Sequence, residues 1–100
     1  MKFILAENLT KENIQKELID ELLSKFSAKF FLQTWDDSSM ASITIHNMDC
    51  TKNYEFVFKN NSLELLLNGK TIKKSSKVSK KTIKSFVNVV YNSIGKTTLI

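Results

Sequence analysis

The fold of this chain is decided by residues 54–74, YEFVFKNNSLELLLNGKTIKK, where large apolar residues recur at every second position and two short turns interrupt the pattern. Such alternation over 54–59 and 62–67 is typical of half-buried antiparallel strands. Asn68-Gly69 favours a type I′ hairpin turn, because both central residues of that turn need a positive φ. Asn60-Asn61 predicts a second hairpin. The chain then returns through Lys70–Lys74 as an edge strand, where exposed lysines oppose edge-to-edge aggregation.

The same alternation occurs earlier in the chain, at residues 30–35 and 42–46. Residues 36–39 between them, Asp-Asp-Ser-Ser, have the composition of a turn, because these short polar side chains hydrogen-bond to their own backbone. The sequence therefore predicts four or five antiparallel strands that follow one another along the chain.

An amphipathic helix is predicted before the strands, after a short opening segment at Phe3–Ala6. Thr10 is a good N-cap for a helix over residues 11–26, and Leu9 and Ile14 stand at the spacing of a hydrophobic staple. Apolar residues recur through this segment at helical spacing, so one side of the helix is expected to face the core.

A second amphipathic helix is predicted after the strands. Ser79 is its expected N-cap, with Val78 and Ile83 again at staple spacing. Apolar residues continue at helical spacing as far as Ile94, and Gly95 stands where a helix C-cap belongs.

The order of these elements predicts a single α+β domain over residues 1–100. No linker, repeat or low-complexity tract divides the chain, and one hundred residues suffice for one hydrophobic core. The expected architecture has two layers: an antiparallel four- to five-stranded meander, with the N-terminal and the C-terminal helix packed on one face. The other face of the sheet is expected to be solvated or to bind a partner.

Positive charge is concentrated in the second half of the chain. Residues 1–50 hold five lysines and eight acids, a net charge of −3, whereas residues 51–100 hold ten lysines and two acids, a net charge of +8. Seven lysines fall within residues 70–84 without an intervening acid: Lys70, Lys73, Lys74, Lys77, Lys80, Lys81 and Lys84. Such a cluster indicates a surface for phosphates or for an acidic protein. All fifteen basic residues are lysine, which acts as a flexible point charge, so binding is expected to follow the nucleic-acid backbone with little sequence specificity.

The predicted binding surface adds one amide and one aromatic side chain to these lysines. Helical spacing places Asn88 on the polar side of the second helix together with Lys77, Lys80, Lys81 and Lys84. Lysines at a helix start oppose the macrodipole at a cost of roughly 0.3–1 kcal/mol each, which favours a binding role, and the free N–H groups there suit a phosphate. Trp35, at a strand end, is the best candidate for an exposed aromatic side chain that stacks on a base. A solvated helix face beside a charged edge strand is the alternative interpretation.

The chain lacks the residue sets that common enzyme chemistries need. His46 and Cys50, the only histidine and cysteine, cannot close a zinc site without two further ligands, and no third residue marks them as a nucleophilic pair. Residues 95–98, Gly-Lys-Thr-Thr, resemble the end of a P-loop, but Val90 stands where the earlier glycine is needed. We therefore expect a protein that is not an enzyme and has no cofactor and no metal ion.

A cytoplasmic protein without membrane contact is expected. The single cysteine excludes an intramolecular disulfide, which fits a reducing compartment. The apolar start is too short for a signal peptide, and no apolar run approaches the roughly 20 residues of a membrane helix.

Two functions follow from these features. Four antiparallel strands before an amphipathic helix resemble, in fold alone, the single-strand-binding modules of PUR repeats, although the preceding helix departs from that pattern. A shared fold does not by itself assign a function. The first hypothesis is a non-enzymatic module that engages nucleic acid through its phosphate backbone with the lysine-rich face of residues 70–84. The alternative is a small inhibitor or adaptor of the phage or mobile-element type, anti-CRISPR-like, that binds a host protein or nucleoprotein complex. A homodimer would cover any apolar patch left on the sheet face or on the first helix.

Overall fold

The computed structural model describes residues 9–26, 31–37, 39–46 and 51–95. Its elements are helix α1 (Lys11–Lys25), strands β1 (Phe31–Asp36), β2 (Ala41–His46), β3 (Asn53–Lys59), β4 (Ser62–Leu67) and β5 (Lys70–Ser75), helix α2 (Lys80–Val90) and the π-helical turn η1 (Tyr91–Gly95). This order confirms the predicted α+β fold, with five strands. The predicted opening segment Phe3–Ala6 and the first residue of the predicted first strand, Phe30, lie outside the described residues.

The five strands form one antiparallel sheet in the order β1-β2-β3-β4-β5, so each strand pairs with its neighbours in the chain. Asn68 and Gly69 have φ angles of 52° and 85°, as the predicted type I′ turn requires. In the turn between β3 and β4, Asn61 has a φ of 66°. A β-bulge at Ile72 interrupts the pairing of β4 with β5. The predicted meander is therefore confirmed.

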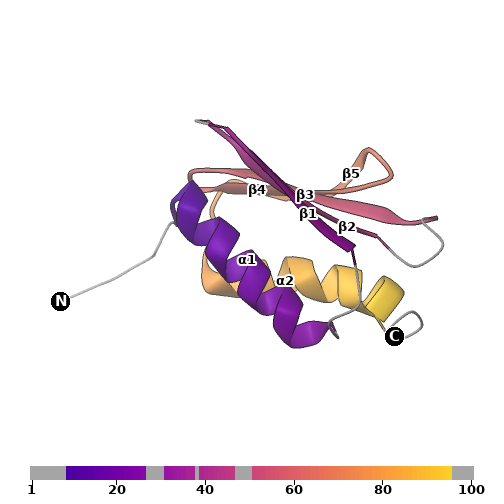
Figure 1. The fold of residues 1–100 in the computed structure, drawn as a ribbon. Coiled ribbons are helices and arrows are strands. Elements are labelled where there is room, and N and C mark those ends of the chain that lie inside the picture. The colour runs from indigo at the N-terminus through magenta and orange to yellow at the C-terminus, as the bar shows by residue number, and fades with distance from the viewer. Residues whose placement is uncertain (1–8, 27–30, 38, 47–50, 96–100) are drawn as a thin grey trace.

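The strand register separates an inner face of the sheet from an outer face. Directly paired residues point to the same side of a sheet, and the row of Ile43, Phe56 and Leu65 across β2, β3 and β4 is fully buried. Figure 1 shows both helices on one side of the sheet, where they cover this inner face. The neighbouring row on the outer face runs through Trp35, Ser42, Val57, Glu64 and Lys74. Neither α1 nor α2 covers the outer face.

Both helices begin where the sequence predicts. The Thr10 hydroxyl accepts a hydrogen bond from the N–H of Asn13 (3.2 Å). Ser79 forms a capping box, in which its hydroxyl accepts from the N–H of Thr82 and the Thr82 hydroxyl accepts from the N–H of Ser79. The apolar sides of the two helices meet over the inner face, and their fully buried members are Ile14, Leu18, Leu22, Val87 and Val90.

The end of the second helix differs from the prediction that Gly95 caps one continuous α-helix. The α-helix ends at Val90, and the chain continues as the wider turn η1 through Gly95. Two tertiary contacts accompany this wider turn. The Tyr91 ring packs edge-on against Phe26, with centroids 5.6 Å apart, and Ser93 accepts a hydrogen bond from the Tyr54 hydroxyl on β3. Neither contact could be read from helical spacing.

The first residue of α1 carries a buried lysine side chain. Lys11 is only 6% exposed, and its ammonium donates to the carboxylate of Asp36 (2.6 Å) and to the backbone carbonyl of Asp37. The hydrogen bond to Asp36 is the main cause that raises the pKa of Lys11 above 10.5, against the opposing effect of burial. The charge is therefore kept and paired rather than lost.

The backbone around Lys11 is tied to two further turns. The Lys11 N–H donates to the Asn60 side chain (2.7 Å), and the carbonyl of Leu9 accepts from the N–H of Asn61 (2.9 Å). The N–H of Leu9 donates to the carbonyl of Val78, just before α2 (3.1 Å). Residues 9–11, which we call the α1 anchor, thus join the β1–β2 turn, the β3–β4 turn and the entry of α2.

A substitution at Phe86 tests how α2 packs against the sheet. Phe86→Ala should lower the free energy of unfolding by about 3–5 kcal/mol, because the change removes a ring that is 2% exposed and leaves a cavity. Leu23→Ala is a matched control on the open side of α1, where Leu23 is 58% exposed, and it should cost less than about 0.5 kcal/mol. Urea unfolding measures both. Equal losses in the two variants would contradict the packing of α2 against the sheet.

Asp37 closes the β1–β2 turn and provides a pH-dependent contribution to stability. Its carboxylate accepts hydrogen bonds from the N–H groups of Met40 (2.9 Å) and Ser39 (2.8 Å). These bonds, led by the one from Met40, lower the pKa of Asp37 from its usual 3.8. A lowered folded-state pKa means that the contribution is present above the unfolded-state pKa and is lost as the pH falls through the folded-state pKa.

Asp37→Asn removes this titration and keeps an acceptor oxygen. The free energy of unfolding should therefore fall less steeply for the variant than for the wild type as the pH drops from about 5 to 2. Urea unfolding at each pH measures the two slopes. Asp20→Asn, which removes an acid from the exposed side of α1, is the control for charge alone. Coincident curves for the two variants would show that the turn hydrogen bonds to Asp37 have no such role.

Candidate functional site

A groove of about 450 Å³ lies between the edge strand β5 and helix α2. Its lining residues are Lys73, Lys74, Ser75, Ser79, Lys81, Thr82, Ser85 and Phe86. Three of them carry ammonium groups, four carry hydroxyl groups, and none is acidic. We call this the β5–α2 groove. Its chemistry suits a ligand with negatively charged oxygen atoms.

Lys73 is held at the wall of this groove by Phe86. Its ammonium lies 5.2 Å from the centroid of the Phe86 ring, which is the geometry of a cation–π contact. The alternation of β5 directs Lys73 toward the inner face, where its ammonium lies over the ring, and Lys74 toward the outer face. Lys73 is therefore more restricted than an ordinary surface lysine.

The hydroxyl groups around the groove hold its backbone in place. Besides the capping box of α2, the Ser75 hydroxyl accepts from the N–H of Lys77 (3.3 Å) and donates to the Lys77 carbonyl (2.6 Å). The capping box already uses the N–H of Thr82. The start of α2 therefore offers fewer N–H groups to a phosphate than the sequence indicates, and the ammonium groups carry the anion-binding capacity.

The remaining lysines of the predicted surface, Lys70, Lys77, Lys80 and Lys84, do not line the β5–α2 groove. Lys80 lies 3.9 Å from the carboxylate of Glu17 on α1. Lys84, one turn further along α2, is exposed and is not among the residues that line the groove. Lys77 is exposed in the loop before α2, and Lys70 is exposed at the far end of β5.

The acidic side of α1 runs beside α2. Lys80 at the start of α2 lies beside Glu17 near the middle of α1, and Phe26 and Tyr91 meet where the two α-helices end, so the helices run in the same direction. The charge of Lys80 is therefore partly balanced by α1 rather than presented to a ligand. The groove side of α2 begins with Lys81, whose i+4 neighbour Ser85 lines the groove and whose i+7 neighbour Asn88 is exposed.

Trp35 is exposed, as predicted, but it is separated from the lysine groove. Its side chain is 52% exposed and lies on β1, the sheet edge opposite β5. Three strands stand between Trp35 and the β5 lysines. Because Trp35 belongs to the outer-face row that ends at Lys74, it is part of a different surface from the β5–α2 groove.

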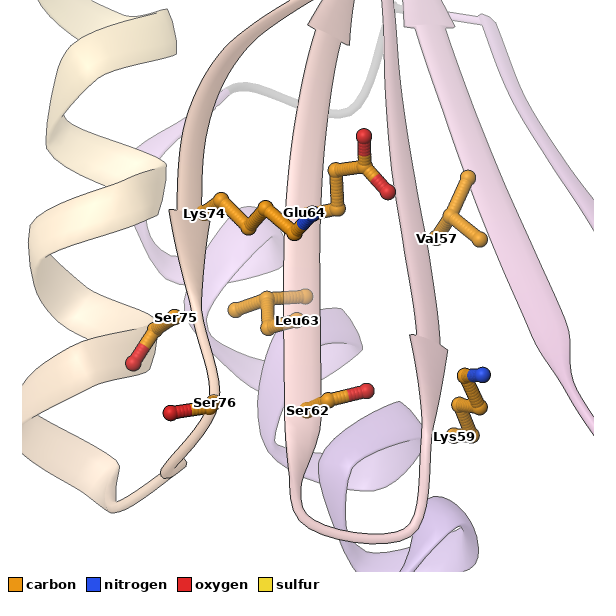
Figure 2. Close-up of a pocket in the computed structure, with 8 residues that line it drawn as sticks. All are labelled: Val57, Lys59, Ser62, Leu63, Glu64, Lys74, Ser75 and Ser76. Atoms are coloured by element: carbon orange, nitrogen blue, oxygen red, sulfur yellow. The ribbon is translucent and has the colours of Figure 1, made fainter.

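A second groove, of about 600 Å³, opens on the outer face over β3, β4 and β5. Its lining residues are Val57, Lys59, Ser62, Leu63, Glu64, Lys74, Ser75 and Ser76. Figure 2 shows Lys74 reaching from β5 toward Glu64 on β4, with Val57 on β3 beyond it. The Glu64 carboxylate also accepts a hydrogen bond from the Thr71 hydroxyl. We call this the outer groove; its mixture of apolar, acidic and basic groups suits a protein surface better than a polyanion.

Sequence reasoning missed a polar cluster between β3 and η1. The Tyr54 hydroxyl donates to the Ser93 hydroxyl (2.7 Å), and the Lys52 ammonium donates to the same oxygen (3.2 Å). Both partners donate, so neither draws a proton from Ser93 as a general base would. The cluster fastens η1 to the sheet. No local pattern could have revealed it, because about forty residues separate Ser93 from its partners.

The described residues provide no metal centre. Among residues 9–26, 31–37, 39–46 and 51–95, no group of three His, Cys, Asp or Glu side chains is placed to hold a metal ion. Cys50 and the P-loop-like residues 96–98 lie outside this part of the chain. None of the described helices is long and apolar enough to cross a membrane.

Comparison with known proteins gives no relative: the chain matches no protein-family model, no curated protein and no solved structure.

Proposed function

We propose that this protein is a non-enzymatic binding module that engages nucleic acid through its phosphate backbone in the β5–α2 groove. The proposal rests on one observation: Lys73 and Lys81 line a single groove that has hydroxyl groups beside them and no acid among its lining residues, whereas Lys74 lines the same groove but directs its side chain to the outer face. Each ammonium that neutralises a phosphate releases counterions, and this release is the main source of affinity for nucleic acid.

The distribution of acids supports this choice of surface. Glu17, Asp20 and Glu21 lie on α1, and α1 packs on the side of α2 that carries Lys80 rather than on the side of β5. A polyanion is therefore attracted to the groove and repelled by the opposite side of the helix pair.

The kind of recognition follows from the residue types. Lysine does not form the planar bidentate contacts with which arginine reads guanine, so sequence discrimination should be weak. The aromatic ring in the groove, Phe86, is buried and covered by Lys73, so it does not offer a face for base stacking. We expect single and double strands to bind by the same phosphate contacts.

A second candidate function is favoured by the outer face. Trp35 is exposed on the same face of the sheet as a groove of mixed polarity, and tryptophan is enriched among the residues that dominate protein interfaces. An inhibitor or adaptor of the phage or mobile-element type that binds a host protein or an acidic nucleoprotein surface would use this face. Capture of a partner from nuclease-treated lysate that depends on Trp35 but not on Lys73 and Lys81 would favour this function.

Salt dependence tests the nucleic-acid proposal. Binding of a labelled 20-nucleotide strand, followed by fluorescence anisotropy between about 50 and 200 mM salt, should weaken steeply as salt rises. The double variant Lys73→Gln/Lys81→Gln should lower affinity at least tenfold. It should also reduce the slope of log K against log salt by about 1.4, since each lost phosphate contact on a single strand contributes about 0.7.

Lys80→Gln/Lys84→Gln is the matched control, because it removes the same charge from two positions of the same helix that do not line the groove. Its affinity should fall less than threefold. Equal losses in the two double variants would show that binding follows net charge and not the groove. Absence of binding by the wild type at low salt would refute the proposed function. Thermal unfolding of each variant verifies that the domain remains folded.

A further inference from the structure

We propose that the outer face of the sheet binds the same face of a second copy, in a two-fold symmetric dimer in which Trp35 of each copy enters the outer groove of the other. This surface shares only Lys74 and Ser75 with the lining of the nucleic-acid groove, and the inference does not depend on the proposed function.

The first argument is the position of the protruding side chain relative to the groove. Trp35 on β1 and Glu64 at the centre of the outer groove on β4 belong to one lateral row. The proposed two-fold axis lies in the interface, runs parallel to the strands and passes midway between β2 and β3. Rotation about this axis places β1 of one copy opposite β4 of the other. Each Trp35 then lies opposite the outer groove of the other copy, at β4. The lateral row of one copy faces the same row of its partner. An indole spans much of the roughly 10 Å by which packed sheets are separated.

The second argument is the chemistry that the indole would meet. Val57 supplies apolar contact on the floor of the outer groove. The Glu64 carboxylate accepts one hydrogen bond from Thr71 and has capacity for another from the indole N–H. A buried tryptophan needs such an acceptor, so the groove satisfies both the ring and its polar edge.

The third argument is charge. The outer face carries the acids Glu55 and Glu64 and the bases Lys59 and Lys74, so two copies of it meet without net repulsion. The β5–α2 groove is lined by three lysines and no acid, so two such grooves would repel each other. For a chain with a net charge of +5, the outer face is therefore the balanced surface on which like copies can meet.

The area predicts a weak dimer. Four matched strands, each about 4.8 Å apart and about 20 Å long, give a contact of roughly 400 Å² per copy in projection. Because side chains protrude from both sheets, the surface buried on the two copies together is larger, on the order of 1000 Å², which is the lower limit for a specific interface. We therefore expect a dissociation constant in the micromolar range.

Fluorescence of the wild-type protein tests directly whether the indole enters the outer groove, because Trp35 is the only tryptophan. As the concentration rises from about 1 µM to 1 mM, the emission maximum should shift to shorter wavelength. In the same range, sedimentation should show the mass increase from 11.5 kDa toward twice that value. A monomer mass throughout overturns the dimer. A dimer that forms without an emission shift overturns the placement of Trp35.

Two variants test the reciprocal geometry. Trp35→Ser removes the inserted side chain, and Val57→Arg obstructs the groove; each alone should weaken dimerisation more than tenfold. Leu23→Ser, an equally exposed apolar position on α1, should leave it unchanged. A mixture of the two variants should associate more tightly than either alone, because the Val57→Arg copy still offers Trp35 to the intact groove of the Trp35→Ser copy. Failure of this rescue, with both variants folded, overturns the two-fold arrangement.

Discussion

The ion pair between Lys11 and Asp36 determines where helix α1 meets the sheet, and the rest of the arrangement depends on it. A lysine ammonium that is removed from water must be paired and hydrogen-bonded, since an unpaired buried charge is strongly unfavourable. Here the carboxylate of Asp36 and the carbonyl of Asp37 satisfy it. The neighbouring backbone bonds of the α1 anchor reach the β3–β4 turn and the entry of α2. One short segment thus positions both helices against one end of the sheet.

The position of the helices then decides which lysines face solvent without an acid beside them. Because α1 and α2 run side by side in the same direction, Glu17 is placed next to Lys80. The opposite side of α2 faces β5, where Lys81 joins Lys73 around one groove with no acid among its lining residues. The lysines form one uniform run in the sequence, but helix packing separates them. The charge of Lys80 is partly balanced by an acid on α1, whereas other lysines of the run form a positive groove.

Strand β5 belongs to both of the surfaces that this molecule offers. Its alternation directs Lys73 toward α2 and Lys74 toward the outer face, and Lys74 lines both grooves. In the proposed two-fold dimer, β5 would extend beyond the matched strands β1–β4, so the β5–α2 groove would stay open on each copy. Face-to-face association would therefore place two positive grooves in one particle, which would increase the apparent affinity for a long polyanion through a high effective concentration.

Local pattern was enough for the elements and their order: Thr10 and Ser79 begin the helices, Asn68-Gly69 forms the type I′ turn, and the alternation of residues 54–67 selects the buried face. These features are determined by the sequence because capping, turn geometry and period-two burial act over a few residues. The tertiary structure alone decided the burial of Lys11, the pairing of Lys80, the separation of Trp35 from the lysines and the replacement of a glycine cap by η1. Each of these depends on contacts between residues ten to seventy positions apart, whose partners are chosen by packing and by charge pairing rather than by spacing along the chain.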